Sequence, residues 1–499
     1  MPSDIGEQPN DLYARLDIRP FINCCGTRTV HGGSLMRPVV VAAMAEAADR
    51  FVNLNELVIA AGRRIAELTG AESALVTAGA AAALIAATAA AMTKGDPERM
   101  LALPKADGLP RRVLMPKGAR FTYDHAIRTA GAQIVEVDDA AALDAALAQG
   151  AAMIATIGTK DANLPIRLEQ LAAIARPHGV PILVDAASEH LERPVPYLAR
   201  GASFVAYSGG KYLRGPQSTG LLLGQSAWIE AARLNAAPHH AIGRPMKISK
   251  EEVIGILTAV EHWAAGRDHA AEQTQWYDDL AEIARLVTAV EGVTTELLPP
   301  GGPHEQVPRL RIAWDRGQVG LDGLGLRERL LEGRPRIMLD DRGATESSVF
   351  LLPFSLEAGE AMLVGRAIAA ALAAAPPGAA PAPVPPAADL SGQWLVEIDF
   401  AADRGRHRLA LRQDGMRLSG RHATLRLEAP IDGTIAGNAF AFASLHPFEG
   451  ANLSYAFTGT LTGEEMSGTV LLGTSGDSAP GPLNMREFGS AAWRARREG

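Results

Sequence analysis

An aspartate and a lysine each stand at the end of an apolar run in this sequence. Asp185 closes the run Pro181–Asp185, and Lys211 follows the run Phe204–Tyr207 behind two glycines. Short apolar runs of this kind are typical of buried strands. Open α/β sheets place their ligands at the carboxyl ends of parallel strands, so we expect Asp185 and Lys211 to share one site.

A lysine and a carboxylate at one site are what pyridoxal phosphate requires. The cofactor forms a Schiff base with the lysine, which here would be Lys211. The carboxylate, here Asp185, keeps the pyridine nitrogen protonated, so that the ring can accept electrons from a substrate carbanion. The pair therefore predicts pyridoxal 5'-phosphate as cofactor.

A third element lies upstream, where the strand-like run Ala74–Thr77 meets an alanine-rich helical stretch. The turn between them holds Gly79, Ala80 and Ala81. Backbone N–H groups and the dipole at a helix start attract anions, so we expect the cofactor phosphate to bind there. Taken alone, such a turn is more often only a place where a helix packs closely on a sheet.

Four segments of the chain carry a family resemblance. Gly79–Ala82, Val184–Ser188 and Ser208–Gly220 resemble the selenocysteine synthase-like branch of fold-type-I pyridoxal phosphate enzymes, which includes D-glucosaminate-6-phosphate ammonia-lyase-like proteins. Ile22–Ser34 looks like the N-terminal N-x-x-G-T stretch of this family, so the resemblance covers roughly residues 15–372. It implies a large domain with a mostly parallel sheet, followed by a smaller α/β domain.

The resemblance also implies roles for further residues. His125 would stack on the cofactor ring and help in proton transfer, since imidazole titrates near neutrality. Ser208 and Thr219 would contact the cofactor phosphate, and Gln217–Thr219 resembles a loop that reaches the phosphate of a neighbouring subunit. The alternatives are a satisfied surface or core histidine and ordinary turn residues. Arg214 is larger than the residue expected in selenocysteine synthases, so their substrate geometry does not transfer simply.

A substrate carboxylate needs a cationic partner, and the planar fork of arginine makes bidentate bonds to it. We expect one of four arginines of the small domain to serve, with solvated charge as the alternative for the rest: Arg309, Arg311, Arg334 and Arg336. Arg336 is preferred because it directly precedes an apolar strand.

The chain is predicted to divide into four parts. Residues 1–248 would form the N-terminal arm and the large cofactor domain, because strand-like runs there alternate with helical patterns. Residues 249–374 would form the small α/β domain, and 375–389 a linker rich in proline and alanine. Residues 390–499, with alternating runs between glycine turns, predict an antiparallel calycin-like barrel or a sandwich.

The last part has no predicted site. A packing or oligomerisation module is the favoured interpretation, and a ligand-holding barrel is the alternative. Its histidines, His407, His422 and His446, are too scattered along the sequence to support a metal proposal.

The amino-acid composition limits the kinds of partner that the protein is expected to bind. The 499 residues carry a net charge of −8, and no basic stripe precedes the family motif, so we expect no nucleic-acid partner. The two cysteines, Cys24 and Cys25, are adjacent and suit neither a disulfide nor a metal site. With neither a signal-peptide pattern nor a long apolar window, we expect a cytoplasmic protein with no membrane partner. The family resemblance implies a homodimer or a larger homo-oligomer.

The favoured reaction is that of a lyase on an amino acid or amino sugar acid. It would abstract the α-proton, with Lys211 as base, and then eliminate a β-substituent and release ammonia. Racemisation, retro-aldol cleavage, transamination and sulfur or selenium transfer remain alternatives, because no motif records which bond is broken. A non-catalytic sensor that binds the cofactor is a further alternative, against which the intact Lys211 and Asp185 argue.

Overall fold

The computed structural model describes residues 12–105, 107–301, 307–377, 384–475 and 487–498. The chain forms two compact units. The first comprises residues 1–313, 327–340 and 351–372, and the second 314–326, 341–350 and 373–499. Of the predicted linker 375–389, residues 378–383 lie outside the described part of the chain.

A seven-stranded sheet is the core of the first unit. Its order is β2-β8-β7-β6-β5-β3-β4, and only β8 runs antiparallel to its neighbours. The prediction of a mostly parallel sheet is therefore confirmed. The strands are β2 (Ser73–Thr77), β3 (Arg112–Pro116), β4 (Gln133–Val137), β5 (Met153–Ile157), β6 (Ile182–Asp185), β7 (Phe204–Ser208) and β8 (Gly220–Gly224).

Helix α3 (Gly79–Thr93) packs on this sheet against β2 and β5 to β8. Every residue from Ala82 to Thr93 is buried. A helix that is apolar all round belongs in a core, and its many alanines let the backbone approach the strands closely. This packing fixes the start of α3 at one edge of the sheet.

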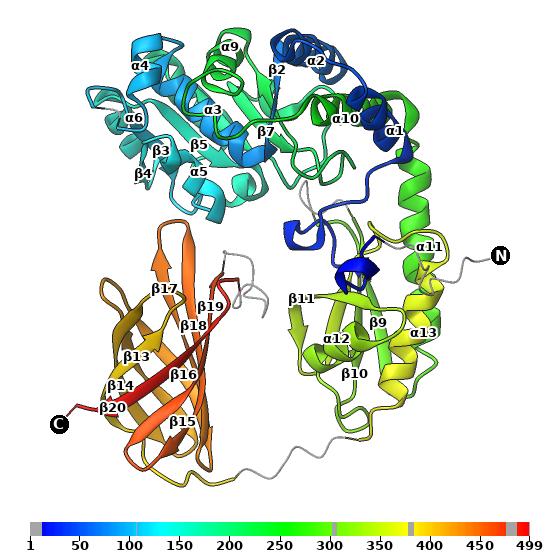
Figure 1. Cartoon of the computed structure of the whole chain (residues 1–499), viewed down its shortest axis with the longest axis vertical. Helices are drawn as coiled ribbons and strands as arrows, with labels where there is room; N and C mark the ends of the chain where they lie inside the picture. Colours follow the sequence, from blue (N-terminus) through cyan, green and yellow to red (C-terminus); the bar gives the residue numbers. More distant parts are fainter. Residues whose placement is uncertain (1–11, 106, 302–306, 378–383, 476–486, 499) are drawn as a thin grey trace. The chain divides into compact units, whose positions relative to one another are not determined.

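Other helices surround the sheet (Figure 1). They are α1 (Pro38–Ala48), α2 (Leu54–Thr69), α4 (Pro97–Ala102), α5 (His125–Thr129), α6 (Ala140–Ala148), α7 (Leu168–Ala175), α8 (Pro196–Ala199), α9 (Ser226–Asn235) and α10 (Lys250–Glu261). Among the described residues, no helix is long and apolar enough to cross a membrane.

A second sheet has the order β1-β11-β12-β10-β9. Its strands are β1 (Ile22–Cys24), β9 (Val293–Leu298), β10 (Arg309–Trp314), β11 (Ile337–Thr345) and β12 (Ser348–Leu351), and its helices are α11 (His269–Val287), α12 (Gly323–Glu332) and α13 (Glu360–Ala373). Strand β1 pairs in parallel with β11, so that Asn23 lies opposite Met338. The N-terminal arm, which the sequence grouped with the large domain, thus joins this sheet.

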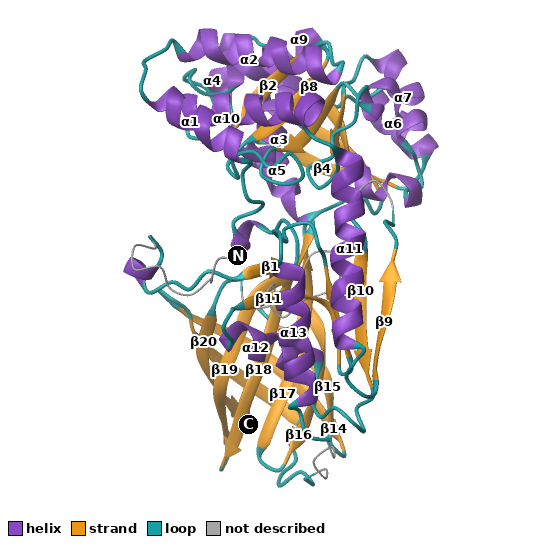
Figure 2. Ribbon diagram, turned by 90° about the vertical axis from the view of Figure 1, so that its right-hand side faces the viewer, coloured by secondary structure: helices purple, strands orange, loops and turns teal. Residues whose placement is uncertain are grey.

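The C-terminal segment is a closed barrel of eight antiparallel strands (Figure 2). Each strand pairs with the next one along the chain, and β20 closes the barrel on β13. Of the two predicted alternatives, the barrel is therefore confirmed. Its strands are β13 (Gly392–Asp399), β14 (Arg404–Asp414), β15 (Arg417–Ala423), β16 (Glu428–Ala436), β17 (Ala439–Phe448), β18 (Ala451–Thr462), β19 (Glu465–Ser475) and β20 (Ser490–Arg497).

Alternate residues of the barrel strands face a packed apolar interior that includes Trp394, Phe442, Phe457 and Trp493. This is the period of two expected for strands with one buried face.

Three buried histidines interrupt the apolar interior of the barrel. Nδ1 of His407 lies 2.9 Å from Nε2 of His422, whose Nδ1 lies 3.1 Å from Nε2 of His446. Ala429 lies opposite His422 on β16, and this small side chain lets the His422 ring reach Ser444 Oγ, 2.7 Å away on β17. The interpretation of these histidines as scattered was wrong, because the hairpin registers bring them together.

The three imidazoles lie in a row and do not converge on one point, because each ring nitrogen of His422 contacts a different histidine. Within the described ranges, no group of histidine, cysteine or acidic side chains is arranged to hold a metal ion.

Acid is expected to destabilise the barrel. Burial lowers the pKa of His407 to about 4 and that of His422 to about 2. Because imidazole in an unfolded chain titrates near pH 6.5, the unfolded state binds more protons below that pH. Stability is thus full above about pH 6.5 and falls as the pH decreases, by on the order of 3 kcal/mol for each of these imidazoles near pH 4.

The measurement is urea unfolding of the whole protein between neutral pH and about pH 4, followed by hydrogen exchange in β14 and β15. His422→Gln should flatten the pH dependence. An equally flat profile in the wild type would contradict the expected role of these imidazoles.

Candidate active site

The carboxyl ends of β5, β6 and β7 meet at one edge of the large sheet. Asp185 lies opposite Ile157 of β5 and Ala206 of β7. Gly220, at the start of β8, lies opposite both Ser208 and Thr77. The register therefore brings Asp185, the segment that leads to Lys211, and the turn before α3 to the same edge.

Asp185 and Lys211 influence each other electrostatically at this edge. Asp185 is buried, and its Oδ1 accepts a hydrogen bond of 2.8 Å from the backbone N–H of Ala187. Burial raises the pKa of Asp185, against the opposing effects of this N–H group and the positive Lys211. Burial also lowers the pKa of Lys211, against the attraction of Asp185. A lysine with a lowered pKa is more readily the neutral amine that attacks a carbonyl carbon.

Glycines allow the Lys211 loop to pack tightly. A Cβ atom added to Gly209 would lie 2.0 Å from Thr219 Oγ1, and one added to Gly210 would lie 2.3 Å from the Cα of Gln217. At Gly220 it would lie 2.4 Å from the carbonyl carbon of Gly79. These approaches exclude larger residues and bring the Gly79 turn against the end of the Lys211 loop.

The turn at Gly79 leaves the start of α3 available to a ligand. Gly79 has a φ of +82°, and the helix begins with no hydrogen bond from a side-chain cap. Gly79 and Ala80 are half-buried and Ala81 is exposed. Uncapped N–H groups at a helix start, together with the helix dipole, are suited to an anion such as phosphate.

The other predicted cofactor contacts differ in their surroundings. Ser208 is half-buried at the end of β7. Thr219 is fully buried, and its hydroxyl donates to the carbonyl of Pro216 at 2.6 Å. Thr219 would have to give up this hydrogen bond in order to donate one to a phosphate.

His125 is the first residue of α5, and its side chain is exposed. The preceding Asp124 is fully buried and makes no capping bond to the helix. Instead, its Oδ2 lies 2.5 Å from Nε of Arg120 and its Oδ1 lies 3.7 Å from Nε of Arg128. Asp124 thus anchors the helix start through ion pairs, and stacking of His125 on the cofactor stays a prediction.

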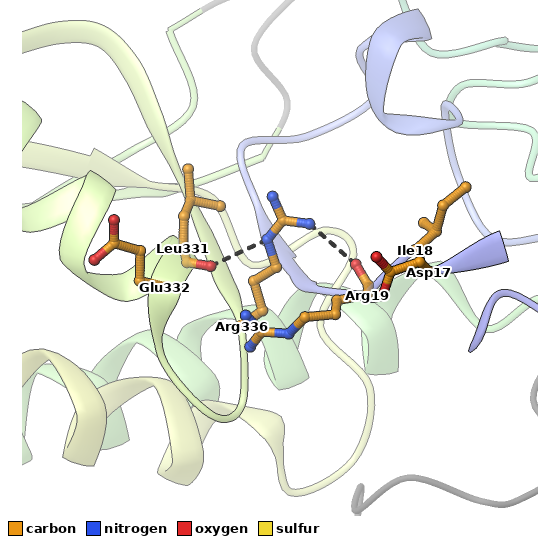
Figure 3. A pocket seen from close by; sticks show the side chains of 6 residues that line it. All are labelled: Asp17, Ile18, Arg19, Leu331, Glu332 and Arg336. Atoms are coloured by element: carbon orange, nitrogen blue, oxygen red, sulfur yellow. Dashed lines mark hydrogen bonds between the residues drawn. The ribbon is translucent and has the colours of Figure 1, made fainter. Parts of the chain in front are cut away.

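Arg336, the preferred partner of a substrate carboxylate, is bonded to backbone carbonyls. Its Nε donates to Leu331 and its Nη1 to Arg19, each at 3.1 Å (Figure 3). It lines an open pocket of about 570 Å³ with Asp17, Ile18, Arg19, Leu331 and Glu332. Neither Asp185 nor Lys211 lines this pocket, so binding of carboxylate by Arg336 also stays a prediction.

A cluster of arginines that the sequence did not predict lies next to the Lys211 loop. Arg37 and Arg267 both pair with Glu272, and Nη2 of Arg267 lies 2.6 Å from it. Nη1 of Arg267 also donates to the backbone carbonyl of Tyr212 at 2.5 Å, beside Lys211. The three segments are far apart in the sequence, and no local motif marks them.

Arg214 extends this arginine cluster. Its side chain is buried, donates to the carbonyl of Phe354 and places its guanidinium carbon 4.6 Å from the centre of the Phe354 ring. Burial and the nearby Arg37 and Arg267 lower the pKa of Arg214 to about 10. Three cations around Glu272 leave this neighbourhood positively charged.

Comparison with known proteins identifies the family. No family model matches the chain. The D-glucosaminate-6-phosphate ammonia lyase of Salmonella typhimurium is 30% identical over 370 residues, which cover 72% of this chain and 97% of the relative. The chain belongs to the D-glucosaminate-6-phosphate ammonia-lyase family. The solved structure of a D-glucosaminate-6-phosphate ammonia-lyase, 28% identical, aligns with a TM-score of 0.65 over 73% of this chain and 100% of that one.

Other relatives carry different names. A 5'-C-glycyluridine monooxygenase-decarboxylase of a Streptomyces species is 31% identical over 344 residues, 66% of this chain and 84% of the relative. L-seryl-tRNA(Sec) selenium transferases match more distantly. The resemblance drawn from the sequence is thus confirmed, and the chain is a pyridoxal phosphate enzyme of fold type I.

The residues at the sheet edge fit this cofactor. Lys211 offers an amine for the Schiff base, Asp185 a buried carboxylate for the pyridine nitrogen, and the uncapped start of α3 a set of N–H groups for the phosphate. Lys211 follows β7, Asp185 ends β6 and the start of α3 follows β2, which are the positions that the sequence predicts.

Proposed function

We propose that this enzyme is a cytoplasmic, homo-oligomeric lyase that releases ammonia from an amino acid or amino sugar acid. The observation that carries the proposal is that Asp185, the segment that leads to Lys211 and the start of α3 share one edge of the large sheet. The similarity to D-glucosaminate-6-phosphate ammonia lyase supports a lyase over the other reactions that such a site can serve.

Each residue would have a distinct task. Bound pyridoxal phosphate supplies an electron sink for a carbanion at the substrate Cα. Lys211 would take the α-proton, and its lowered pKa leaves more of it as the neutral base. Asp185 would hold a negative charge where it keeps the proton on the pyridine nitrogen. A β-hydroxyl would then leave as water, and returning water would release ammonia and a 2-keto acid.

The arginine cluster favours an acidic substrate. Arg37, Arg214 and Arg267 lie beside the loop that carries Lys211. Glu272 and the exposed Glu357, whose Oε1 lies 3.6 Å from Nη1 of Arg214, balance two of their three charges. Nε of Arg37 and Nε of Arg214 are buried and have no hydrogen-bond partner among the described residues. Guanidinium groups with free donors bind carboxylate and phosphate strongly.

The Streptomyces relative supports a second candidate reaction. Its identity to this chain, 31%, is close to the 30% of the ammonia lyase, although the match covers less of both chains. Its name describes a monooxygenase-decarboxylase of 5'-C-glycyluridine. The two reactions differ in products, because a decarboxylating monooxygenase consumes oxygen and releases carbon dioxide.

The deciding experiment is a substrate panel. Purified protein loaded with pyridoxal phosphate is offered D- and L-amino acids, amino sugar acids with and without phosphate, and a glycyl nucleoside. Ammonia and keto acid are measured together with oxygen and carbon dioxide. We expect equal amounts of ammonia and keto acid without oxygen uptake. Oxygen uptake with carbon dioxide release would favour the second candidate, and no turnover across the panel would favour a sensor.

An exposed apolar surface in the N-terminal part supports the oligomer. More than half of the exposed large apolar side chains lie between residues 12 and 59, and Phe51 is entirely exposed. A contiguous patch of exposed apolar groups marks an interaction surface, and we infer that part of this stretch forms one. These side chains lie outside the barrel, so a contact between subunits through them would not need the barrel.

Deleting residues 375–499 is therefore expected to leave the cofactor spectrum and at least a dimer intact. The ammonia lyase relative is matched over 97% of its length by 72% of this chain, so it lacks a counterpart for a large part of the rest. Light scattering and the visible spectrum of the truncated protein check this. A monomer, or a protein unable to hold pyridoxal phosphate, would show that the barrel belongs to the catalytic assembly.

A further inference from the structure

A buried glutamate lies on the loop after β6, close to Asp185. Glu189 is 6% exposed, and its backbone N–H donates to the carbonyl of Ala186 at 3.0 Å. A Cβ atom added to Gly158, the residue after β5, would lie 2.2 Å from Glu189 Oε1. The carboxyl group therefore rests on the backbone at the carboxyl end of β5, where Ile157 pairs with Asp185.

Only one oxygen of this carboxyl group is hydrogen bonded. The hydroxyl of Tyr197 donates to Glu189 Oε2 at 2.6 Å. Oε1 is buried and has no hydrogen-bond partner in the part of the chain that the structure describes. A buried polar atom without a partner costs free energy, and a bound ligand can remove that cost.

The ionisable groups that face Glu189 are acids and phenols. They are Asp185, Asp161, Glu192, Tyr197 and Tyr207. The nearby Arg200 lies 5.6 Å from the centre of the Tyr197 ring but pairs with Asp161 and Glu169. Burial and the neighbouring carboxylates raise the pKa of Glu189 to about 7, although the Tyr197 hydrogen bond opposes them. Since Tyr197 donates to Oε2, a proton on Glu189 sits on Oε1 and makes it a free donor.

The order of substituents on the cofactor ring shows which of its atoms would face this donor. The ring carbon that bears the aldehyde lies between the carbon with the phosphate arm and the carbon with the 3-oxygen. The proposed phosphate site is at the start of α3, which follows β2, whereas Glu189 lies over β5. In the sheet order β2-β8-β7-β6-β5, these two strands lie on opposite sides of β6 and β7, which lead to Asp185 and Lys211. A ring with its phosphate toward β2 therefore turns its 3-oxygen toward Glu189.

We propose that Glu189 is a cofactor-binding residue whose Oε1 hydroxyl donates a hydrogen bond to the 3-oxygen of pyridoxal phosphate. The inference rests on the proposed function, since it takes the same site for the cofactor. It gives Gly158 a role as well, because any side chain there would displace the carboxyl group.

The test measures equilibrium binding of two ligands to the full-length apoprotein, without any turnover. The ligands are pyridoxal phosphate and an analogue that lacks the 3-oxygen, and the variants are Glu189→Leu, Glu189→Gln and Tyr197→Phe. Glu189→Leu should weaken pyridoxal phosphate binding about tenfold and leave the analogue unchanged. Glu189→Gln keeps a donor of similar shape, so it should stay within about threefold of the wild type.

A pH series separates this role from a merely structural one. Wild-type affinity for pyridoxal phosphate should fall as the pH rises through neutrality, because Glu189 then loses the donated proton. The affinity of the Glu189→Gln protein should lack this fall with rising pH. In Tyr197→Phe, the fall should occur at a different pH. This comparison still decides the question if Glu189→Leu fails to fold.

The possible failures are distinguishable. Equal losses for both ligands in Glu189→Leu, or the same pH dependence in wild type and Glu189→Gln, would overturn the role of Glu189 while the cofactor still binds. A wild-type protein that does not bind pyridoxal phosphate would overturn the proposed function together with this inference.

Discussion

Replacing Lys211 with alanine is expected to abolish turnover and remove the visible absorption of the bound cofactor. Lys211 lies at the sheet edge in a desolvated position, where burial lowers its pKa and Asp185 attracts its charge. The variant loses both the amine that bonds covalently to pyridoxal phosphate and the base for the α-proton. Removing a nucleophile or base of this kind lowers rates by several orders of magnitude. Absorption spectra and release of ammonia measure the two losses separately.

Lys160 offers a matched control for this substitution. It follows β5 at the same edge of the sheet, and its Nζ donates to the carbonyls of Gly118 and Arg120 at 3.2 and 2.8 Å. Lys160→Ala should keep the visible band and lower the melting temperature, because it removes these two hydrogen bonds. A band that survives in Lys211→Ala and disappears in Lys160→Ala would reverse the assignment.

The local parts of the site were predictable because each depends on a short stretch of chain. The apolar runs that end at Asp185 and Ser208 form β6 and β7, and parallel pairing alone brings their carboxyl ends together. The small-residue turn at Gly79 starts a buried helix for the same local reason. The close approaches at Gly209, Gly210 and Gly220 show why these positions of the Lys211 segment need glycine.

The parts that were not predictable depend on contacts between distant segments. The arginine cluster joins Arg37, Arg214 and Arg267 through Glu272, and no spacing in the sequence records that meeting. The line of histidines in the barrel follows from the registers of three hairpins, and a shift of one residue would turn His422 outward. Strand β1 joins β11 across more than 300 residues, and only tertiary packing fixes such a pairing.

Replacing Asp185 with asparagine is expected to leave the cofactor attached but to lower turnover about a thousandfold or more. Asparagine has nearly the shape of aspartate, and its side-chain oxygen can still accept the hydrogen bond that Ala187 donates to Asp185. It carries no negative charge, however, so the pyridine nitrogen would lose its proton and the ring its capacity to accept electrons. On the same sample, the visible spectrum of the bound cofactor should therefore persist while the rate of ammonia release falls.

A buried aspartate whose charge is already paired with arginines provides the comparison for this variant. Asp124 is fully buried and pairs with Arg120 and Arg128, so Asp124→Asn should lower the melting temperature more than the turnover. Asp185→Asn should show the reverse pattern, because Asp185 is a buried acid whose charge serves the cofactor rather than the fold. Near-normal turnover in Asp185→Asn would mean that another acid protonates the ring. Glu189, a buried acid on the loop after β6 that Asp185 influences electrostatically, would then be the first residue to replace in an Asp185→Asn background.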